Sequence, residues 1–435
     1  MTEANWVPVS KGLLPGRNTI GPLLLITLMP IFVMVIPYTL EKLDGSLAQL
    51  WVMVRADGVV NTIYNIWYPW NDLYTWKIIA VFVGLQLALI KLVPANEFKA
   101  PITPAGNVPV YPANGFQVYC ITLFLFVAGA YMGLYKGGVL VDYLGNIISS
   151  MSVFALIFCV LLYLKGKHAP SSTDADSTGN VVFDYYWGTE LHARILGVDV
   201  KQMSNCRFGM MFWGVFMVSA LLKQYETYGY VSDALCVNTL LQLIYVTKFF
   251  IWETGYFATY DIMHDRSGFY LCYIPSMYCS HTLYLAHRPV ELGLPVAAFM
   301  IILGLLMTLI QFDMDHQRLR VRRADGKCTV WGNPADIIRT TYVTEDGNSK
   351  NGLLLANGWN GISRHVHYIP ELIMAALWAL PCKSDCVLPY AYPIYLFILL
   401  MDRMYRIDER CAKKYGKYWQ EYCKKVPYLI VPGLW

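Results

Sequence analysis

The sequence predicts an all-α membrane protein in which about ten helices cross the bilayer. Of its 435 residues, 56% are hydrophobic and only 15% are charged, and the mean hydropathy is +0.40. Soluble domains carry about 25% charged residues, so this composition lies outside their range. The apolar residues also gather in blocks, and a block of about 20 apolar residues is long enough to span a bilayer as a helix.

Ten apolar blocks are the candidates for these helices. The first block follows a polar segment with an acidic residue and has no small-residue cleavage site, so we expect a retained span rather than a cleaved signal peptide. The last two blocks are short and interrupted by prolines, which makes the count approximate. The blocks lie near residues 20–40, 77–95, 118–135, 147–164, 208–222, 233–252, 268–286, 294–312, 366–381 and 387–402.

Basic residues predict the orientation of these spans, because Lys and Arg near span ends favour the cytosolic side. With ten spans, the basic groups before the first span and after the fourth, eighth and tenth all lie on one side, which we assign to the cytosol. These residues are Lys11, Arg17, Lys165, Lys167, Arg194, Lys201, Arg318, Arg320, Arg322, Arg323, Lys327, Arg403, Arg406, Arg410, Lys413, Lys414, Lys417, Lys424 and Lys425.

Two connecting segments carry specific expectations. The polar segment SSTDADSTGN (171–180) is predicted to be a flexible loop. Among the 11 cysteines, no pair has the spacing and histidine partners of a zinc site. Cys382 and Cys386 flank a short loop on the non-cytosolic side, where a disulfide and two free thiols are both open.

Ionisable residues interrupt the apolar pattern between the sixth and seventh spans. The stretch WETGYFATYDIMHDRSGFY (252–270) contains Glu253, Asp261, His264 and Asp265. Ionisable groups at membrane depth are costly and usually face a cavity, which favours a functional role. The alternative for each residue is a cap at a helix end near the interface.

The C-terminal third combines positive charge with aromatic rings. Arg318 and Arg322 are four residues apart and would share one helix face, which suits a phosphate-bearing ligand, although anionic lipid head groups are the alternative. LLLANGWNGISRHVHYIPEL (353–372) and DRMYRIDERCAKKYGKYWQEYC (402–423) add rings, donors and a glycine turn. No GxGxxG motif follows a strand, so a Rossmann site is excluded.

Several of these stretches together resemble the sterol reductases of the endoplasmic reticulum, the family of the C14-, C24(28)- and 7-dehydrocholesterol reductases. HRPVELG (287–293), RRADGKCTVWG and the LLLANGW run resemble the 7-dehydrocholesterol branch in particular. The matching stretches are TPAGNVPVYPANG (103–115), FDYYWGTELHARI (183–195), TYDIMHDRSGFYL (259–271), RRADGKCTVWG (322–332), LLLANGWNGISRHVHYIPEL and RCAKKYGKYWQEYCKKVPYLIVPG (410–433).

The resemblance implies a multi-pass protein of the endoplasmic reticulum membrane with a ten-helix bundle. Residues 1–310 would form the transmembrane bundle with sterol-facing helices, and residues 311–435 an NADPH-binding part open to the cytosol. It implies a sterol substrate and contact with membrane lipid, no nucleic acid partner, and leaves self-association or association with other sterol-pathway enzymes open. The cofactor-binding positions it implies are Arg318, Arg322, Leu355, Asn360, His367, Tyr368, Cys411, Ala412, Lys413, Lys414, Tyr415 and Tyr422.

The implied reaction is NADPH-dependent reduction of the 7,8 double bond of a 5,7-diene sterol, in which protonation precedes hydride transfer and no metal takes part. The candidate acids, or members of a proton relay, are Glu253, Tyr256, Asp261 and His264. Alternatives are a non-catalytic sterol-binding scaffold, a reductase of the C14 or C24 double bond, and a membrane methyltransferase of the isoprenylcysteine type, which would use S-adenosylmethionine.

The chain departs from the family pattern at three places. Many relatives carry tryptophan at the position of Asn360. Relatives usually carry aspartate at the position of Ile407, four residues before Cys411, whereas here the aspartate is the next residue, Asp408. The stretch GFYLCYIP (268–275) is about five residues shorter than in the branch that it resembles.

Overall fold

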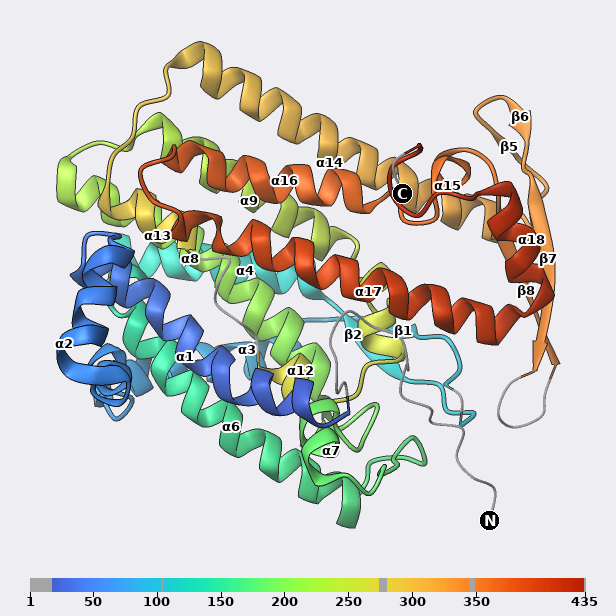
Figure 1. Ribbon diagram of the computed structural model, residues 1–435, viewed down its shortest axis with the longest axis horizontal. Coiled ribbons are helices and arrows are strands. Elements are labelled where there is room, and N and C mark those ends of the chain that lie inside the picture. Colours follow the sequence, from blue (N-terminus) through green and yellow to red (C-terminus); the bar gives the residue numbers. More distant parts are fainter. Residues whose placement is uncertain (1–17, 104, 274–279, 344–348, 434–435) are drawn as a thin grey trace. The chain divides into compact units, whose positions relative to one another are not determined.

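The computed structural model describes residues 18–103, 105–273, 280–343 and 349–433, and most of them are helical (Figure 1). They form two compact units. The large unit comprises Gly16–Ala297 with Trp378–Ala391, and the C-terminal unit comprises Ala298–Leu377 with Tyr392–Trp435. The polar segment before the first expected span, and residues 274–279 of the seventh, lie outside the described residues.

Six described helices are long and apolar enough to cross a membrane. Five belong to the large unit and the sixth, α14, belongs almost entirely to the C-terminal unit. These helices are α1 (Ile20–Lys42), α3 (Leu73–Leu92), α6 (Leu144–His168), the continuous helix formed by η1 (Gln202–Met210) and α8 (Met211–Tyr228), α9 (Asp233–Ile251), and α14 (Leu294–Arg323).

The four other expected spans take different forms, so a count of ten is not established. The third and ninth are shorter apolar helices, α4 (Gly115–Tyr131) and α16 (Tyr368–Ala379). The tenth begins α17 (Ala391–Tyr415), which continues into the polar tail. The described part of the seventh consists of α12 (Phe269–Cys272) and α13 (Ser280–His287).

One long helix of the large unit was not among the expected spans. Helix α2 (Leu47–Ile66) starts at Ser46, whose hydroxyl accepts a hydrogen bond from the Gln49 amide. It is kinked at Gly58, where φ is +79°. Arg55 and Asp57 interrupt its apolar sequence, and for that reason the sequence pattern did not predict a span there.

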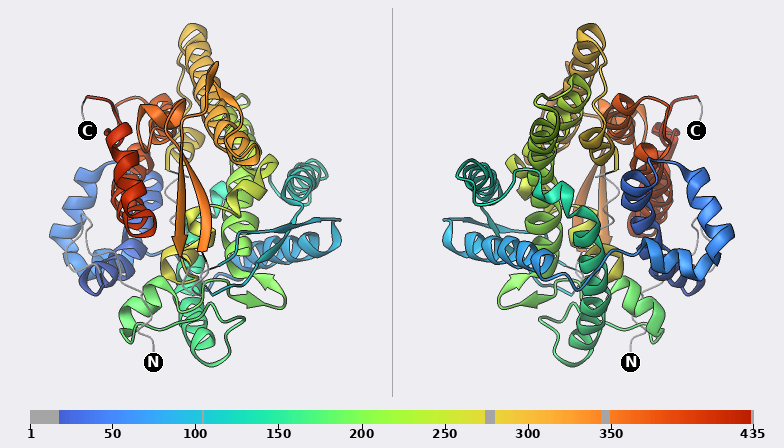
Figure 2. Two further views of the ribbon diagram at one scale, coloured as in Figure 1. Left: turned by 90° about the vertical axis from the view of Figure 1, so that its right-hand side faces the viewer. Right: turned by 90° about the vertical axis from the view of Figure 1, so that its left-hand side faces the viewer.

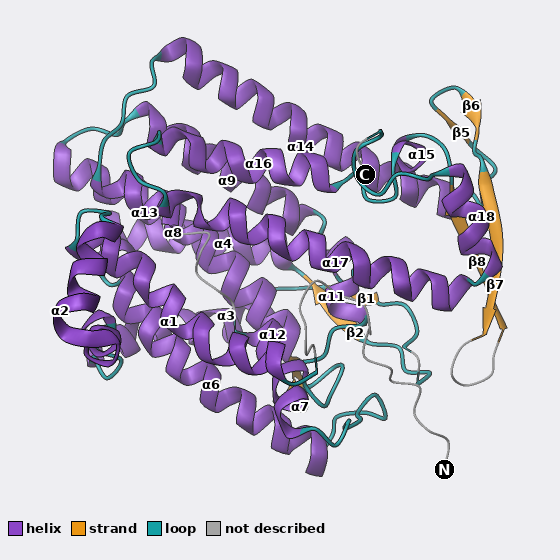
Figure 3. Ribbon diagram, in the orientation of Figure 1, coloured by secondary structure: helices purple, strands orange, loops and turns teal. Residues whose placement is uncertain are grey.

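The remaining elements of the large unit are short (Figure 3). Strands β1 and β2 pair antiparallel with Phe98 opposite Tyr111, and the Tyr111 ring stacks on Phe257 at a centroid distance of 4.5 Å. These short elements are β1 (Asn96–Lys99), β2 (Val110–Ala113), α5 (Val139–Asp142), α7 (Val181–Trp187), β3 (Arg194–Ile195), β4 (Val198–Asp199), α10 (Glu253–Tyr256), α11 (Tyr260–Met263), η3 (Leu380–Cys382) and η4 (Leu388–Tyr390).

The C-terminal unit adds two hairpins to its helices. Strands β7 (Ile337–Val343) and β8 (Ser349–Leu355) form a long antiparallel ribbon, with Ile337 opposite Leu355 (Figure 2). Ile338 of this ribbon packs in a buried cluster with Trp419, Tyr422 and Val426. The other elements are β5 (Thr329–Val330), β6 (Asn333–Pro334), α15 (Trp359–Ile362) and α18 (Lys417–Lys425).

The polar segment 171–180 differs from the flexible loop that was expected. Ser177 Oγ and Thr178 Oγ1 donate to the Asp184 carboxylate at 2.6 and 2.7 Å, and the Asn180 side chain caps α7. In the sequence, these small polar residues suggest disorder. In the structure, they donate hydrogen bonds to one buried carboxylate and cap one helix, and these contacts hold the segment in a defined conformation.

Cys382 and Cys386 are free thiols rather than a disulfide. Their sulfur atoms lie near different backbone carbonyls. Cys382 Sγ is 3.5 Å from the His281 oxygen, and Cys386 Sγ is 3.3 Å from the Gly45 oxygen. Each thiol therefore packs as a small buried side chain in its own environment.

Two backbones cross in direct contact at Gly188 and Gly268 of the large unit. A Cβ atom on Gly188 would lie 2.7 Å from the Gly268 nitrogen and the Ser267 carbonyl carbon. A Cβ atom on Gly268 would collide with the Gly188 nitrogen and the Trp187 carbonyl carbon. Because backbone atoms cannot rotate away as a side chain can, the crossing requires glycine at both positions.

We expect Gly268→Ala to lower the free energy of unfolding by about 3 kcal/mol, since the added methyl group overpacks the crossing. Gly179→Ala is the matched control, because Gly179 has φ +80° but open space around it, so backbone strain alone should cost about 1 kcal/mol. Thermal unfolding of both variants in the same detergent would rank the two effects. An equal or smaller loss for Gly268→Ala would contradict the crossing.

Candidate functional site

Two arginines lie at the polar end of α14 in the C-terminal unit, as the sequence predicted. Arg318 Nη2 is 3.0 Å from Asp315 Oδ1, and the Arg318 side chain remains 45% exposed. Arg322 lies one turn further on, where it interacts electrostatically with Arg318, Tyr415 and Tyr342. No ion pair of Arg322 with a carboxylate is found within the described part of the chain. Two adjacent guanidinium groups, one of which has no carboxylate partner among the described residues, form a basic face that can bind an anion.

Aromatic rings lie beside this basic face. Tyr342 from β7 and Tyr415 from the end of α17 meet edge to face at a centroid distance of 5.7 Å. The Lys414 ammonium lies over both rings, at 4.1 Å from the Tyr342 centroid and 5.0 Å from the Tyr415 centroid. Burial raises the pKa of Tyr415 to about 12, so its hydroxyl stays neutral at physiological pH.

The stretch 358–368 is fixed by contacts at both of its ends. At its start, the Trp359 amide donates to Gln317 Oε1 at 3.0 Å, and the Trp359 indole donates to Asp313 Oδ2 at 2.7 Å. At its far end, the amides of Arg364 and His365 donate to the carbonyls of Tyr428 and Leu429 at 3.0 and 2.8 Å. The chain terminus therefore orders this stretch.

Asn360 and Tyr422 are brought into contact. The Tyr422 hydroxyl donates to the Asn360 backbone oxygen at 3.0 Å, and Tyr422 also interacts electrostatically with Arg318. Because the contact uses the backbone, it does not depend on the side chain at position 360. Burial raises the pKa of Tyr422 to about 12, so it also remains a hydrogen-bond donor.

His367 and Tyr368 pack edge to face, with ring centroids 4.5 Å apart. His365 stacks on Tyr368 at 5.3 Å, and His367 interacts electrostatically with Arg318. Arg318 is therefore within reach of Arg322, His367 and Tyr422, three of the other predicted cofactor positions.

Asp408 provides a carboxylate next to the position where relatives carry aspartate. Its Oδ2 lies 3.3 Å from Arg364 Nη1, and its Oδ1 lies 3.9 Å from His365 Nε2. Arg364 also donates to Cys423 Sγ at 2.7 Å. Asp408, one residue after the position where relatives usually carry aspartate, thus places a carboxylate beside Arg364.

The other predicted cofactor positions differ in their exposure. Leu355 is buried and packs in one hydrophobic cluster with Val321 and Val330. Cys411 packs against the cluster of Ile338, Trp419, Tyr422 and Val426, and burial raises its pKa to about 11. Ala412 and Lys413 are exposed, and Lys413 pairs with Glu409 at 3.0 Å.

These residues fit a phosphorylated, ring-bearing cofactor. The adjacent guanidinium groups of Arg318 and Arg322 repel each other, and a bound phosphate would relieve that repulsion. Tyr342, Tyr415 and Tyr422 provide ring faces nearby, and the hydroxyl groups of Tyr415 and Tyr422 are neutral donors. The described residues hold no group of three or more metal-ligating side chains.

In the large unit, Glu253 lies in a buried ion pair with Arg207 of η1. Both terminal guanidinium nitrogens, Nη1 and Nη2, contact the carboxylate, and Arg207 Nη2 lies 3.1 Å from Glu253 Oε2. The same oxygen accepts a hydrogen bond from the Gly115 amide at 2.9 Å, and Arg207 Nη2 also donates to Asn114 Oδ1 at 3.0 Å. Both carboxylate oxygens are occupied by contacts with Arg207 and the Gly115 amide, which favours an anchoring role for Glu253 over that of an acid.

The three other candidate acids lie close to Glu253 in sequence but in other surroundings. Tyr256 packs with Phe249 and Phe257, at centroid distances of 5.1 and 6.5 Å. His264 lies edge to face with Tyr260 at 5.1 Å. Asp261 and His264 are partly exposed, so both side chains are accessible for proton exchange.

A buried lysine holds the segment that carries these residues. Lys201 is fully buried, and its ammonium donates to the carbonyls of Ile262 and Asp265 at 2.5 and 2.8 Å, with the Asp261 oxygen at 3.4 Å. Burial lowers the pKa of Lys201 to about 8, but the negative charges of Asp199 and Asp265 oppose this shift. Lys201 is therefore a positioning residue for the 261–265 segment.

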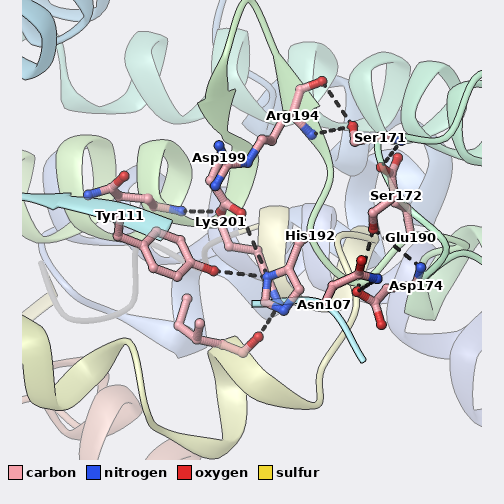
Figure 4. Close-up of polar contacts among 12 residues, drawn as sticks. Asn107, Tyr111, Ser171, Ser172, Asp174, Glu190, His192, Arg194, Asp199 and Lys201 are labelled. Atoms are coloured by element: carbon pink, nitrogen blue, oxygen red, sulfur yellow. Dashed lines mark hydrogen bonds and ion pairs between the residues drawn. The ribbon is translucent and has the colours of Figure 1, made fainter. Parts of the chain in front are cut away.

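Lys201 belongs to a buried polar cluster that the sequence analysis did not identify (Figure 4). The Tyr111 hydroxyl is 2.9 Å from His192 Nδ1, and the same nitrogen lies 3.8 Å from Asp199 Oδ2. Burial lowers the pKa of His192, so this histidine is neutral at physiological pH. His192, Asp199 and Lys201 all lie within FDYYWGTELHARILGVDVK (183–201), which was the available signal, but their spacing alone does not show that they meet.

We expect Glu253→Gln to lower the free energy of unfolding by about 3–5 kcal/mol, because it leaves Arg207 buried without a counter-charge. The measurement is thermal unfolding of the purified protein. Asp261→Asn is the control, since Asp261 is partly exposed and should change stability by less than about 1 kcal/mol. A Glu253→Gln variant with unchanged stability would argue for an acid rather than an anchor.

Comparisons with known proteins agree with the motifs. The model of the family described as "Ergosterol biosynthesis ERG4/ERG24 family" matches residues 16–435. The chain is 46% identical over 417 residues to the 7-dehydrocholesterol reductase of Arabidopsis thaliana, which covers 94% of this chain and 96% of that protein.

Other relatives include a second 7-dehydrocholesterol reductase and an enzyme named for a different double bond. The 7-dehydrocholesterol reductase of Danio rerio is 31% identical, covering 95% of this chain and 91% of that protein. The Delta(14)-sterol reductase TM7SF2 of Mus musculus is 33% identical, covering 85% of this chain and 86% of that protein. With its apolar helices and nearly full-length similarity, the chain belongs to the ERG4/ERG24 family of sterol reductases and is a membrane oxidoreductase of sterol biosynthesis.

Proposed function

We propose that this protein reduces the 7,8 double bond of a 5,7-diene sterol with NADPH, in the membrane of the endoplasmic reticulum. Similarity over nearly the whole chain to a protein named 7-dehydrocholesterol reductase is the observation that carries the choice of double bond. The basic face formed by Arg318 and Arg322 supports a phosphorylated nicotinamide cofactor, the cofactor class that this family generally uses.

The residues of the C-terminal unit would bind NADPH through charge and ring contacts. Arg318 and Arg322 would bind the 2′-phosphate of NADPH, because a guanidinium fork matches phosphate oxygens. Tyr415 and Tyr422 would offer neutral hydroxyl donors, and the stretch with Asn360, His367 and Tyr368 would complete the wall. When bound, NADPH would supply the hydride.

The substrate requires a proton donor from the protein. A conjugated 5,7-diene without an electron-withdrawing group is too electron-rich to accept hydride readily, so protonation at carbon 8 comes first and leaves an allylic cation at carbon 7. We propose that the donor or relay lies among Tyr256, Asp261 and His264. Asp261 and His264 lie on the 261–265 segment that Lys201 holds. Glu253 would act through the fold, since its carboxylate is committed to Arg207.

Reduction of another sterol double bond is the principal alternative, because a Delta(14)-sterol reductase is also among the relatives. A non-catalytic sterol-binding scaffold is the second alternative. Membership in the sterol reductase family replaces the methyltransferase interpretation. Expression in cells that accumulate 5,7-diene sterols, followed by gas chromatography, distinguishes these outcomes. Loss of the diene with retention of the 5,6 double bond supports the proposal, whereas an unchanged sterol profile contradicts it.

We expect Arg318→Ala and Arg322→Ala each to weaken NADPH binding by about tenfold or more while NADH binding changes little. The reason is that a charge-assisted hydrogen bond contributes about 1.5–3 kcal/mol, and only NADPH carries the additional phosphate. Calorimetric titration of the purified variants with both cofactors gives the comparison. Arg339→Ala is the control, because this exposed arginine of the same unit pairs with Asp325. Equal losses for NADPH and NADH would refute the assignment.

We expect at least one of Tyr256→Phe, Asp261→Asn and His264→Gln to reduce turnover by about 10²–10⁴-fold, the usual effect of losing a general acid. NADPH affinity should stay near that of the unmodified protein, because the three residues lie outside the predicted cofactor positions. Sterol product is measured by gas chromatography, and cofactor affinity is measured on the same preparations. Normal turnover in all three variants would place the proton source elsewhere.

A further inference from the structure

The polar end of α14 carries a second group of basic residues, which the proposed cofactor wall does not use. An α-helix turns by about 100° per residue, so Arg320 and Arg323 point about 160° and 140° away from Arg318 around the helix axis. Both are exposed. Lys327, whose amide donates to the Ala324 carbonyl in the turn after the helix, is exposed as well. Arg320, Arg323 and Lys327 form the second basic face of the C-terminal unit.

The three charges of the second basic face have no carboxylate partner among the residues that the structure describes. The two acids that follow α14 most closely are engaged by other cations. Arg339 Nη1 lies 3.1 and 3.2 Å from the two carboxylate oxygens of Asp325, and Lys425 Nζ lies 2.6 Å from Asp336 Oδ1. Local positive charge that is not neutralised attracts an anionic ligand.

The hairpin of β5 and β6 lies beside the second basic face. Arg320 Nη2 donates to the Thr329 carbonyl of β5 at 2.5 Å. The next residue, Val330, packs in a buried cluster with Val321 of α14. These two contacts hold the hairpin against the polar end of the helix, so the residues at its tip and the second basic face share one region of the unit.

Trp331 is exposed at the tip of this hairpin although its backbone conformation is unfavourable. Trp331 and Gly332 are the two residues between β5 and β6, with φ of +49° and +81°. Two-residue turns of this kind favour Asn-Gly, because a bulky residue rarely adopts a positive φ. The Trp331 side chain nevertheless remains 54% exposed. Packing within the unit therefore does not explain why a tryptophan occupies this position.

The depth of Trp331 relative to the bilayer follows from its contacts with α14. Residues 294–312 contain no charged residue and extend for about 28 Å as a helix, close to the roughly 30 Å of the hydrocarbon core. Asp313, the first charged residue after this run, accepts a hydrogen bond from the Trp359 indole at 2.7 Å. The Trp331 ring packs edge to face on Trp359 at a centroid distance of 5.0 Å. Trp331 therefore lies near the level where α14 leaves the hydrocarbon, which is the depth that tryptophan favours.

An anionic phospholipid combines the groups that suit this region. Its phosphodiester and acidic head group are ligands for guanidinium and ammonium groups. Its glycerol backbone and upper acyl chains form the amphipathic layer in which an indole ring is stable. A soluble anion would bind the cations but leave the ring exposed. Phosphatidylcholine would cover the ring, but its own positive charge cancels that of its phosphate.

We propose that Arg320, Arg323, Lys327 and Trp331 form a binding site for an anionic phospholipid in the leaflet that borders the polar end of α14. The three cations would bind the head group, and the indole would lie against the glycerol backbone and the upper acyl chains. The site contains none of the proposed cofactor or proton-donor residues. It is therefore independent of the proposed reaction and goes beyond it.

The test titrates the purified full-length protein in detergent with dioleoylphosphatidylserine or dioleoylphosphatidylcholine and measures bound lipid by native mass spectrometry. A basic residue near an anionic lipid surface typically contributes about fivefold in affinity. We therefore expect Arg323→Gln combined with Lys327→Gln to weaken phosphatidylserine binding by about tenfold or more. Phosphatidylcholine binding should change by less than about twofold, because this lipid has no net charge.

A matched double variant controls for the loss of charge. Lys417→Gln combined with Lys424→Gln removes two exposed cations from α18 of the same unit, neither of which belongs to the proposed cofactor positions. This variant should bind phosphatidylserine within about twofold of the unmodified protein. NADPH at saturation should not displace the lipid, because Arg318 points to the other side of α14. Inorganic phosphate at the concentration of the lipid should not displace it either, because it makes no contact with the ring.

Trp331→Asn tests the contribution of the ring. Asparagine tolerates a positive φ, so the hairpin should keep its turn and the thermal stability in detergent should change little. The loss of an apolar contact should weaken phosphatidylserine and phosphatidylcholine binding alike, by about threefold or more. The charge variants should thus change the preference between the two lipids, whereas the ring variant should change the affinity for both.

Three results would overturn the proposal. The first is an equal loss of phosphatidylserine binding in the two double variants, since binding would then follow net charge alone. The second is displacement of phosphatidylserine by NADPH, which would place the lipid on the cofactor face. The third is displacement by inorganic phosphate or unchanged lipid binding in Trp331→Asn, either of which would indicate a site for a free anion. None of these measurements uses sterol turnover, so failure of the lipid site leaves the proposed reaction intact.

Discussion

The buried pair of Arg207 and Glu253 is the constraint on which much of the large unit depends. It joins η1 to α10, and its hydrogen bonds to Asn114 and Gly115 add the start of α4. A single unpaired charge in this apolar setting would be strongly destabilising, so the two residues must meet whenever the unit is folded. The pair thereby sets the register of three elements that are far apart in the sequence.

A second buried charge continues this arrangement. Lys201 lies just before η1 and donates to the backbone of residues 261–265, which follow α10. The π-helix is thus held at one end by an ammonium group and in its middle by a guanidinium group. One face of η1 packs in the core through Cys206 and Arg207, and another lines an apolar cavity of about 670 Å³ through Ser204 and Phe208.

The C-terminal unit uses charge differently. Most of its described arginines and lysines are at least partly exposed, and Lys414 lies over the rings of Tyr342 and Tyr415. The chain terminus pairs with residues 363–365, which fixes the stretch that contains His367 and Tyr368. Basic groups held in place by rings and backbone contacts can accept an anionic ligand without first rearranging, which lowers the cost of binding.

Two of the three departures from the family pattern, at Asn360 and at Ile407, have local structural explanations. Asn360 contributes its backbone oxygen to Tyr422, a contact that any residue can make. Asp408 reaches Arg364 and His365 although relatives usually carry the carboxylate one residue earlier. Both positions thus keep a defined contact within the C-terminal unit, and neither departure removes the basic and aromatic character of the proposed cofactor wall.

The sequence by itself determined the membrane class and the family, because hydrophobic length and dense local motifs are readable along the chain. Six of the predicted spans are helices of sufficient length, and Arg318 interacts electrostatically with His367 and with Tyr422. Only the tertiary structure decided that Glu253 pairs with Arg207, that Lys201 holds the 261–265 segment, and that residues 171–180 are ordered. The partners in these contacts come from distant segments or from hydroxyl groups whose orientation the sequence does not specify. Which buried charge is neutralised, and by what, is a property of the packed chain.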